Sequence, residues 1–308
     1  MWDPAGLSYQ VLVLAAAGVA AFAGPGARRL DRVAQRWGLP GSEQSRGLLR
    51  AYLRRTRRGR AVGVALAAFT SSVLLYAWSP VVDATGTVSG PFAPFGIVLL
   101  LSGYFTGSAL SEVTWRMPAS GARRAAGLEV RRRTTYLPSW VTAWQRALAV
   151  LALVLLGALL LLVRRPAAEP DVLVRSPAWG SVLAALVVAC ALLAELGQRR
   201  IVTRPQSWTD ADTVTVDDAV RAHSQRNLAV AVVSLELLLL TQLAIQVLLR
   251  LADVVRSPGV GDVLDHLGAV AYLAVPLAVV GVLLHRLRRA PRAATVPARG
   301  PANSGTTR

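Results

Sequence analysis

Apolar residues gather along the chain in seven long runs that are separated by charged segments. Each run has about the 17 to 25 residues that a helix needs to cross a hydrocarbon core of roughly 30 Å. The predicted spans are Leu7 to Gly24, Ala61 to Trp78, Phe92 to Leu110, Ala147 to Val163, Ser181 to Leu196, Leu228 to Leu249 and Leu267 to Leu284. The pattern predicts an all-α fold, a polytopic membrane bundle of about seven transmembrane helices.

The spans leave no room for a separate soluble domain. We expect one transmembrane domain with basic cytoplasmic loops over residues 1–288 and a disordered cytoplasmic tail over residues 289–308. The AFAG run that ends at Gly24 resembles a signal-peptide cleavage site, but the preceding segment carries Asp3 and no basic residue. We therefore expect the first span to be retained.

Charge fixes the expected orientation of these spans. All 34 basic residues are Arg, and the net charge is +17. The segments that follow spans one, three, five and seven hold most of that charge. The opposite side of the membrane has just five arginines: Arg164, Arg165, Arg175, Arg250 and Arg256. By the positive-inside rule the rich side is cytoplasmic. The prediction is a multi-pass protein of the cell membrane, with its N-terminus outside and its C-terminus in the cytoplasm.

Short similar motifs suggest an internal repeat. QRALAV begins at Gln145, QRNLAV begins at Gln225, and the related RGRAVGV begins at Arg58. Each motif opens a span, and each is preceded by a span that leads into a basic loop. The alternatives are chance similarity between Ala/Leu-rich segments and three related helical hairpins followed by a final helix.

Polar groups inside the predicted spans are few. Glu236 lies near the middle of the sixth span, with Gln242 and Gln246 further along it, and these form the candidate intramembrane polar site. Two hypotheses stand for Glu236: a neutral acid bonded to a neighbouring side chain, or a proton-binding site. Gly103 and Gly107 form a GxxxG ridge that predicts close packing between helices.

The first basic loop has an amphipathic helical pattern. Leu49, Tyr52 and Leu53 share one face of the segment Ser45 to Arg60, which is otherwise rich in Arg. Anionic lipid is the expected partner, and simple retention of a solvated basic loop is the alternative. Nucleic acid is not expected, because the positive charge is spread along the membrane boundary.

The third cytoplasmic loop supplies a candidate docking segment. Thr215 is expected to cap a short helix with Asp217 and Asp218 in its first turn and Arg221 one turn later. We expect this segment to dock a cytoplasmic partner. A metal site is the alternative for its acidic residues and His223, but their spacing matches neither an EF-hand loop nor a zinc motif.

Two acidic residues lie at the cytoplasmic ends of predicted spans, and each has an arginine nearby in the sequence. Arg116 follows Glu112 by four residues, and Arg199 follows Glu195 at the same spacing. In a helix this order gives a favourable ion pair worth a few tenths of a kcal/mol. We expect both acids to be paired in this way.

No catalytic, cofactor-binding or metal residue is predicted. The chain has no Lys for a retinal Schiff base, no HExxH, no Walker A segment and no Asp in a predicted span. Its one Cys and three His residues give no metal-site pattern. The protein is expected not to be an enzyme, although a membrane enzyme of unrecognised type remains an alternative.

A resemblance adds a hypothesis about function. The runs RRIVTRPQ and DDAVRAHS, with RRRTTYLPSW from Arg131 to Trp140, resemble a group of uncharacterised multi-pass integral membrane proteins of high-GC actinobacteria. The resemblance implies a membrane protein whose genes accompany those of regulators and ABC ATPases. The first hypothesis is therefore a non-catalytic, transport- or export-linked or accessory membrane subunit with a possible ABC-type ATPase or other membrane subunit as partner. The alternative is a proton- or solute-coupled carrier that uses Glu236.

Overall fold

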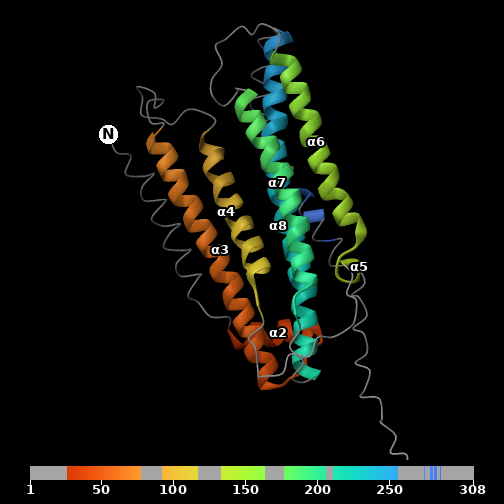
Figure 1. Ribbon diagram of the computed structural model, residues 1–308. Coiled ribbons are helices and arrows are strands. Elements are labelled where there is room, and N and C mark those ends of the chain that lie inside the picture. Colours follow the sequence, from red (N-terminus) through yellow and green to blue (C-terminus); the bar gives the residue numbers. More distant parts are fainter. Residues whose placement is uncertain are drawn as a thin grey trace, which may run out of the picture.

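The computed structural model describes residues 26–77, 92–116, 133–163, 177–205 and 211–255, with a few isolated positions between 274 and 285. Within these ranges every regular element is a helix (Figure 1), so the all-α prediction is confirmed there. The helices are α2 (Ala27–Trp37), α3 (Glu43–Ala77), α4 (Phe92–Thr114), α5 (Arg133–Tyr136), α6 (Ser139–Val163), α7 (Pro177–Val202) and α8 (Ala211–Val255). The predicted first span, most of the predicted last span and the tail lie outside the described residues.

Three of the helices are long and apolar enough to cross a membrane. They are α6, α7 and α8, and they contain the predicted fourth, fifth and sixth spans. The described residues therefore give three candidate spans, fewer than the seven expected from the sequence. Large apolar side chains such as Leu151, Leu193 and Leu196 are exposed on α6 and α7. An apolar exterior of this extent suits a lipid surrounding better than water.

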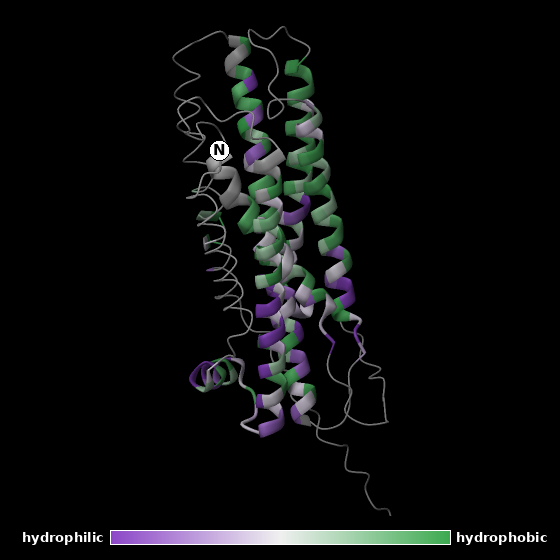
Figure 2. Cartoon of the chain, turned by 90° about the vertical axis from the view of Figure 1, so that its left-hand side faces the viewer, coloured by the Kyte–Doolittle hydropathy of each residue, from purple (hydrophilic) through white to green (hydrophobic). Residues whose placement is uncertain are grey.

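Helix α8 is the centre of the bundle. It packs against α3, α4, α6 and α7. In Figure 1, α3 and α4 lie to the left of α7 and α8, and α6 lies to the right. In its most apolar window 61% of the residues are buried, against 17% in α6. The largest group of buried apolar side chains joins α6, α7 and α8 and includes Leu159, Val187 and Leu243. Hydrophilic residues concentrate at the end of the bundle near α2 (Figure 2), which we call the polar end.

Helices α3 and α4 meet through glycines on both sides. A Cβ atom added to Gly63 would lie 2.1 Å from the carbonyl oxygen of Gly103, and one added to Gly107 would lie 2.2 Å from that of Gly59. The two backbones are therefore in direct contact along two GxxxG ridges, which a side chain at any of these positions would separate. The ridge at Gly103 and Gly107 thus lies inside the bundle, against α3.

Helix α2 lies across the polar end (Figure 1) and ends in a Schellman motif. Gly38 has a φ of 65°, its N–H donates to the carbonyl of Gln35, and the N–H of Leu39 donates to that of Ala34. The turn brings Trp37 and Leu39 against a buried group that includes Tyr52 of α3 and Val216 of α8. The amphipathic face of the first basic loop is therefore covered by protein, since Leu49 and Tyr52 are both 0% exposed.

The third cytoplasmic loop, expected between Leu196 and Leu228, is much shorter than predicted. Helix α7 continues to Val202, and α8 already begins at Ala211. Thr215 therefore lies inside α8 and does not cap it, so that prediction is wrong. The reason is that Val216 and Val220 supply an apolar face which packs against the other helices and extends α8 well beyond its apolar run.

The expected hairpins differ from the observed pairing. Helices α7 and α8 pack together, as the third hairpin requires. Helix α4, however, packs against α3 and α8 and has no extensive contact with α6, its expected hairpin partner. The repeat stays a prediction about sequence, while its middle hairpin is not a packed pair.

Candidate functional site

A buried carboxylate joins three helices at the polar end. Glu112 of α4 is 0% exposed. The Tyr52 hydroxyl of α3 lies 2.9 and 2.8 Å from its two oxygens, while Ser224 and Asn227 of α8 donate at 2.7 and 2.8 Å. Arg204, just after α7, donates to the backbone carbonyl of Glu112. We call these five residues the Glu112 node.

Aromatic rings enclose one side of this node. Tyr52 meets Trp115 edge to face at 5.5 Å between ring centroids, and Trp37 lies 4.6 Å from His223. Burial, together with the neighbouring Glu112 carboxylate, raises the pKa of Tyr52 well above its usual value. The phenol therefore keeps its proton and acts as a hydrogen-bond donor. Glu112 is held by distant residues, so the local pairing expected with Arg116 does not explain its position.

Next to the node, Arg221 of α8 holds the end of α7. Its guanidinium is 1% exposed and contacts the Asp217 carboxylate at 2.7 Å. It also donates to the last backbone carbonyls of α7 and the turn that follows, those of Ile201, Val202, Arg204 and Pro205. A cation at a helix C-terminus satisfies carbonyls that have no partner in the helix and complements the helix dipole. We call this group the Arg221 cap.

The cap changes the interpretation of the expected docking segment. Asp217 and Arg221 are buried and bonded to each other. Neither side chain is therefore exposed, and docking of a partner by this segment stays a prediction. Asp218 is partly exposed and accepts a weak bond from Tyr136 at 3.4 Å. The segment joins α7 to α8.

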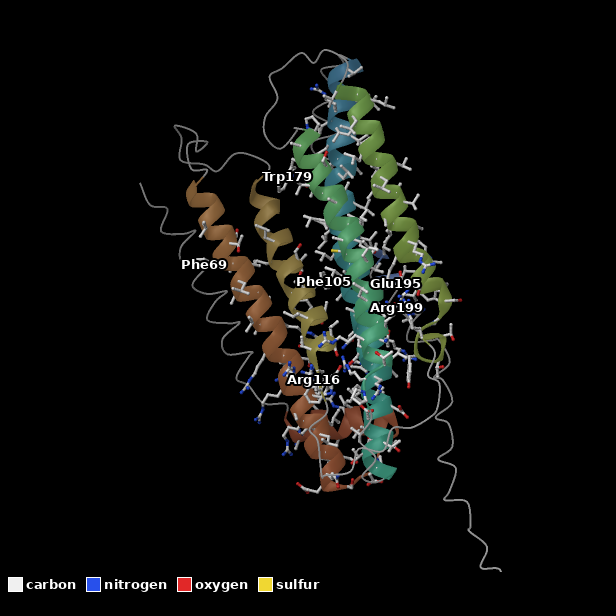
Figure 3. All side chains as sticks on the ribbon, viewed as in Figure 1. Phe69, Phe105, Arg116, Trp179, Glu195 and Arg199 are labelled. Carbon is white, nitrogen blue, oxygen red and sulfur yellow. The ribbon has the colours of Figure 1, made fainter. Side chains whose placement is uncertain are left out.

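A second charged group lies between α6 and α7. Arg133, Arg146 and Arg199 all contact the same oxygen of Glu195, at 3.2, 3.1 and 3.2 Å. The pair expected between Glu195 and Arg199 is thus present, one turn apart on α7 (Figure 3), but it is part of a larger cluster. We call these four residues the Glu195 cluster.

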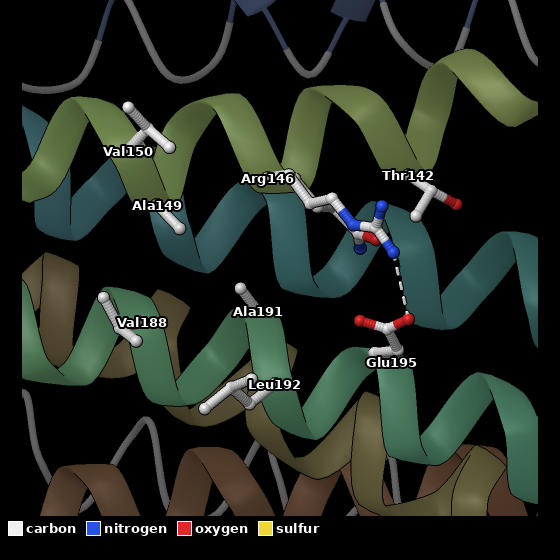
Figure 4. A pocket seen from close by; sticks show the side chains of 9 residues that line it. Thr142, Arg146, Ala149, Val150, Val188, Ala191, Leu192 and Glu195 are labelled. Carbon is white, nitrogen blue, oxygen red and sulfur yellow. Dashed lines mark hydrogen bonds and ion pairs between the residues drawn. The ribbon is translucent and has the colours of Figure 1, made fainter.

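A groove runs from the Glu195 cluster along α6 and α7. Its volume is about 280 Å³. Arg146 and Glu195 face each other at one end, and small or aliphatic side chains line the rest (Figure 4). The lining residues are Thr142, Gln145, Arg146, Ala149, Val150, Val188, Ala191, Leu192 and Glu195. The groove is therefore charged at one end and apolar along its length.

The two QR motifs converge beside this cluster. Gln198 of α7 donates to the side chain of Gln145 at 3.3 Å, and Gln225 donates to the backbone carbonyl of Gln198 at 2.7 Å. All three side chains are buried. Equivalent positions of the two motifs therefore contact one residue of α7, which the sequence pattern alone did not indicate.

The three residues of the expected intramembrane polar site are spread along α8. Glu236 is 0% exposed, and neither carboxyl oxygen has a hydrogen-bond partner among the described residues. Gln246 is ten residues further along α8, about 15 Å at the helical rise, and lies near Gly180. Gln242 is partly exposed.

The described residues contain no group of three potential metal ligands. Comparison of the chain with protein-family models, curated proteins and solved structures finds no match. The resemblance to actinobacterial membrane proteins therefore stays a prediction.

Proposed function

We propose that the protein is a non-catalytic membrane subunit, transport- or export-linked, whose polar end binds a separate energy-supplying subunit such as an ABC-type ATPase. The proposal includes a seven-span bundle with the N-terminus outside and the polar end in the cytoplasm. Its support is the distribution of arginine along the sequence and the construction of the polar end.

The continuity of α8 carries the proposal. At 45 residues it is about 68 Å long, more than twice the roughly 30 Å of a hydrocarbon core. With the apolar run beginning at Leu228, residues 211–227 extend about 25 Å beyond the membrane. One unbroken helix therefore links the apolar bundle to the polar end.

The Glu112 node and the Arg221 cap make that polar end firm. They join α8 to α3, α4 and the end of α7 through buried hydrogen bonds. When a partner moves the polar end, α8 would transmit that movement to the apolar part of the bundle, because the two parts belong to one continuous helix. A transport subunit without its own energy source needs such a connection.

Purification from native membranes in mild detergent tests the proposal. We expect an ATP-hydrolysing subunit to accompany the protein at a fixed ratio, measured by quantitative mass spectrometry. Reversing two exposed charges of α3, Arg50→Glu with Arg54→Glu, is expected to remove the partner while the protein stays in the membrane. The control is Arg199→Glu at the groove. Recovery of wild-type protein without an ATPase would contradict the proposal.

The burial of Glu236 favours a second candidate function, a proton-coupled carrier. Neither oxygen of its buried carboxyl group has a hydrogen-bond partner in the part of the chain that the structure describes, which is costly and calls for a functional reason. Because no partner among the described residues would be left unpaired, we expect Glu236→Leu to insert and fold at least as well as wild type. This differs from what a bonded structural acid would show.

Labelling with a hydrophobic carbodiimide, which attacks protonated carboxyl groups, tests the carrier hypothesis. If Glu236 exchanges protons with the solvent, its adduct should form in wild type, slow as pH rises and disappear in Glu236→Gln. Peptide mass spectrometry measures the adduct, and the bonded Glu112 is the internal control. Labelling that does not depend on pH, or no labelling at all, would contradict the carrier role.

A further inference from the structure

The groove between α6 and α7 has the polarity of one lipid molecule. Its charged end is formed by Arg146 and Glu195, and about 6 Å further along α6 the wall is Val150 and other aliphatic side chains. At about 280 Å³ it is near the lower limit of small-molecule pockets, roughly 300 Å³. It suits a segment of hydrocarbon chain better than a whole polar metabolite.

The charge at the polar end of the groove is unbalanced. Three guanidinium groups share a single carboxylate oxygen of Glu195. Arg133 is 24% exposed and also donates to Gln198, whereas the side chains of Arg146 and Arg199 are 67% and 65% exposed. Two arginines therefore remain accessible to a second anion, and a phosphate is the anion that guanidinium groups bind with the best geometry.

The surroundings of the groove indicate where that anion comes from. The wall residue Leu192 is exposed, as are Leu193 and Leu196 on the same helix and Leu151 on α6. These side chains would meet acyl chains if α6 and α7 span a membrane, and the arginines would then lie at headgroup level. A soluble phosphate would leave the apolar wall empty.

We propose that this groove binds one anionic phospholipid, with its phosphate at Arg146 and Arg199 and the start of an acyl chain along Ala149, Val188 and Ala191. The site differs from a general attraction of anionic lipid to basic loops, because it has a defined wall and two defined cations. It does not depend on the proposed transport role.

Native mass spectrometry of the protein from nanodiscs of mixed phosphatidylglycerol and phosphatidylcholine tests the site. Wild type is expected to keep one phosphatidylglycerol. Arg146→Gln with Arg199→Gln should weaken its binding roughly thirtyfold, the effect of two arginines near an anionic surface. Arg50→Gln with Arg54→Gln, the same change of charge on α3, should retain the lipid.

A second pair of variants tests the apolar wall. Ala191→Phe should fill the groove and displace the lipid, whereas Ala185→Phe, on the exposed face of the same helix, should not. Equal loss of lipid in both arginine pairs would overturn the proposal, as would full retention in Ala191→Phe. Displacement of the lipid by millimolar glycerol phosphate would also overturn it, because the site would then belong to a soluble phosphate. If Ala191→Phe does not insert, the arginine pairs decide.

Discussion

Replacing Glu112 by Ala is expected to lower the free energy of unfolding by about 3 to 5 kcal/mol, because two buried donors and one partly buried donor lose their acceptor and a cavity forms. Tyr52, Ser224 and Asn227 come from two other helices, so the loss also weakens contacts between α3, α4 and α8. Unfolding in mild detergent, followed by denaturant titration, measures the effect.

Two further variants sharpen this result. Glu112→Gln keeps the shape but turns an NH₂ group toward donors, so we expect a smaller loss of about 1 to 3 kcal/mol. Glu43→Ala, at an exposed position of α3, should change the stability by about 0.5 kcal/mol or less. If Glu112→Ala unfolds at the same denaturant concentration as Glu43→Ala, the node does not hold the helices together.

The second large effect is expected at the Arg221 cap. Arg221→Ala leaves Asp217 buried without its cation and uncaps the end of α7, for an expected loss of about 3 to 5 kcal/mol. Arg221→Lys keeps the charge but cannot reproduce the planar fork that reaches several carbonyls, so it should rescue little. The same denaturant titration measures both variants.

A double variant separates the ion pair from the cap. Removing both charges, Asp217→Ala with Arg221→Leu, avoids an unpaired buried charge and should recover part of the stability lost in Arg221→Ala. The loss that remains measures the uncapped carbonyls of α7. Arg199→Ala, at the 65% exposed arginine of the Glu195 cluster, should have an effect of about 1 kcal/mol or less. A loss for Arg221→Ala no larger than that would contradict the structural role of the cap.

The sequence predicted those features that depend on periodicity and residue size. Apolar runs indicated α6, α7 and the apolar part of α8, since length and hydropathy alone select helices able to cross a membrane. The GxxxG ridge at Gly103 and Gly107 indicated a close contact because glycine lacks a side chain. Its partner ridge, at Gly59 and Gly63, lies in RGRAVGV, which was noted as part of a repeat and not as a packing surface.

The buried polar groups could not be predicted, because their partners are far apart in sequence. The hydrogen-bond partners of Glu112 are 60, 112 and 115 positions away in the sequence. The sequence pattern indicated just Arg116, four positions away, as a partner. Arg221 reaches carbonyls 16 to 20 residues back. The continuity of the helices was also missed: the helical segments expected in the first and third cytoplasmic loops are not separate from the spans, because α3 and α8 run through them without a break.

Cysteine accessibility tests most directly our proposal that α6, α7 and α8 cross a membrane with the polar end in the cytoplasm. In a Cys190→Ala background, which removes the one native thiol, single cysteines are placed at Ala178, exposed at the start of α7, and at Gly47, exposed on α3 at the polar end. A membrane-impermeant maleimide should label Ala178→Cys in intact cells and Gly47→Cys after lysis alone. Labelling of Gly47→Cys in intact cells, or protection of both positions until lysis, would contradict the account.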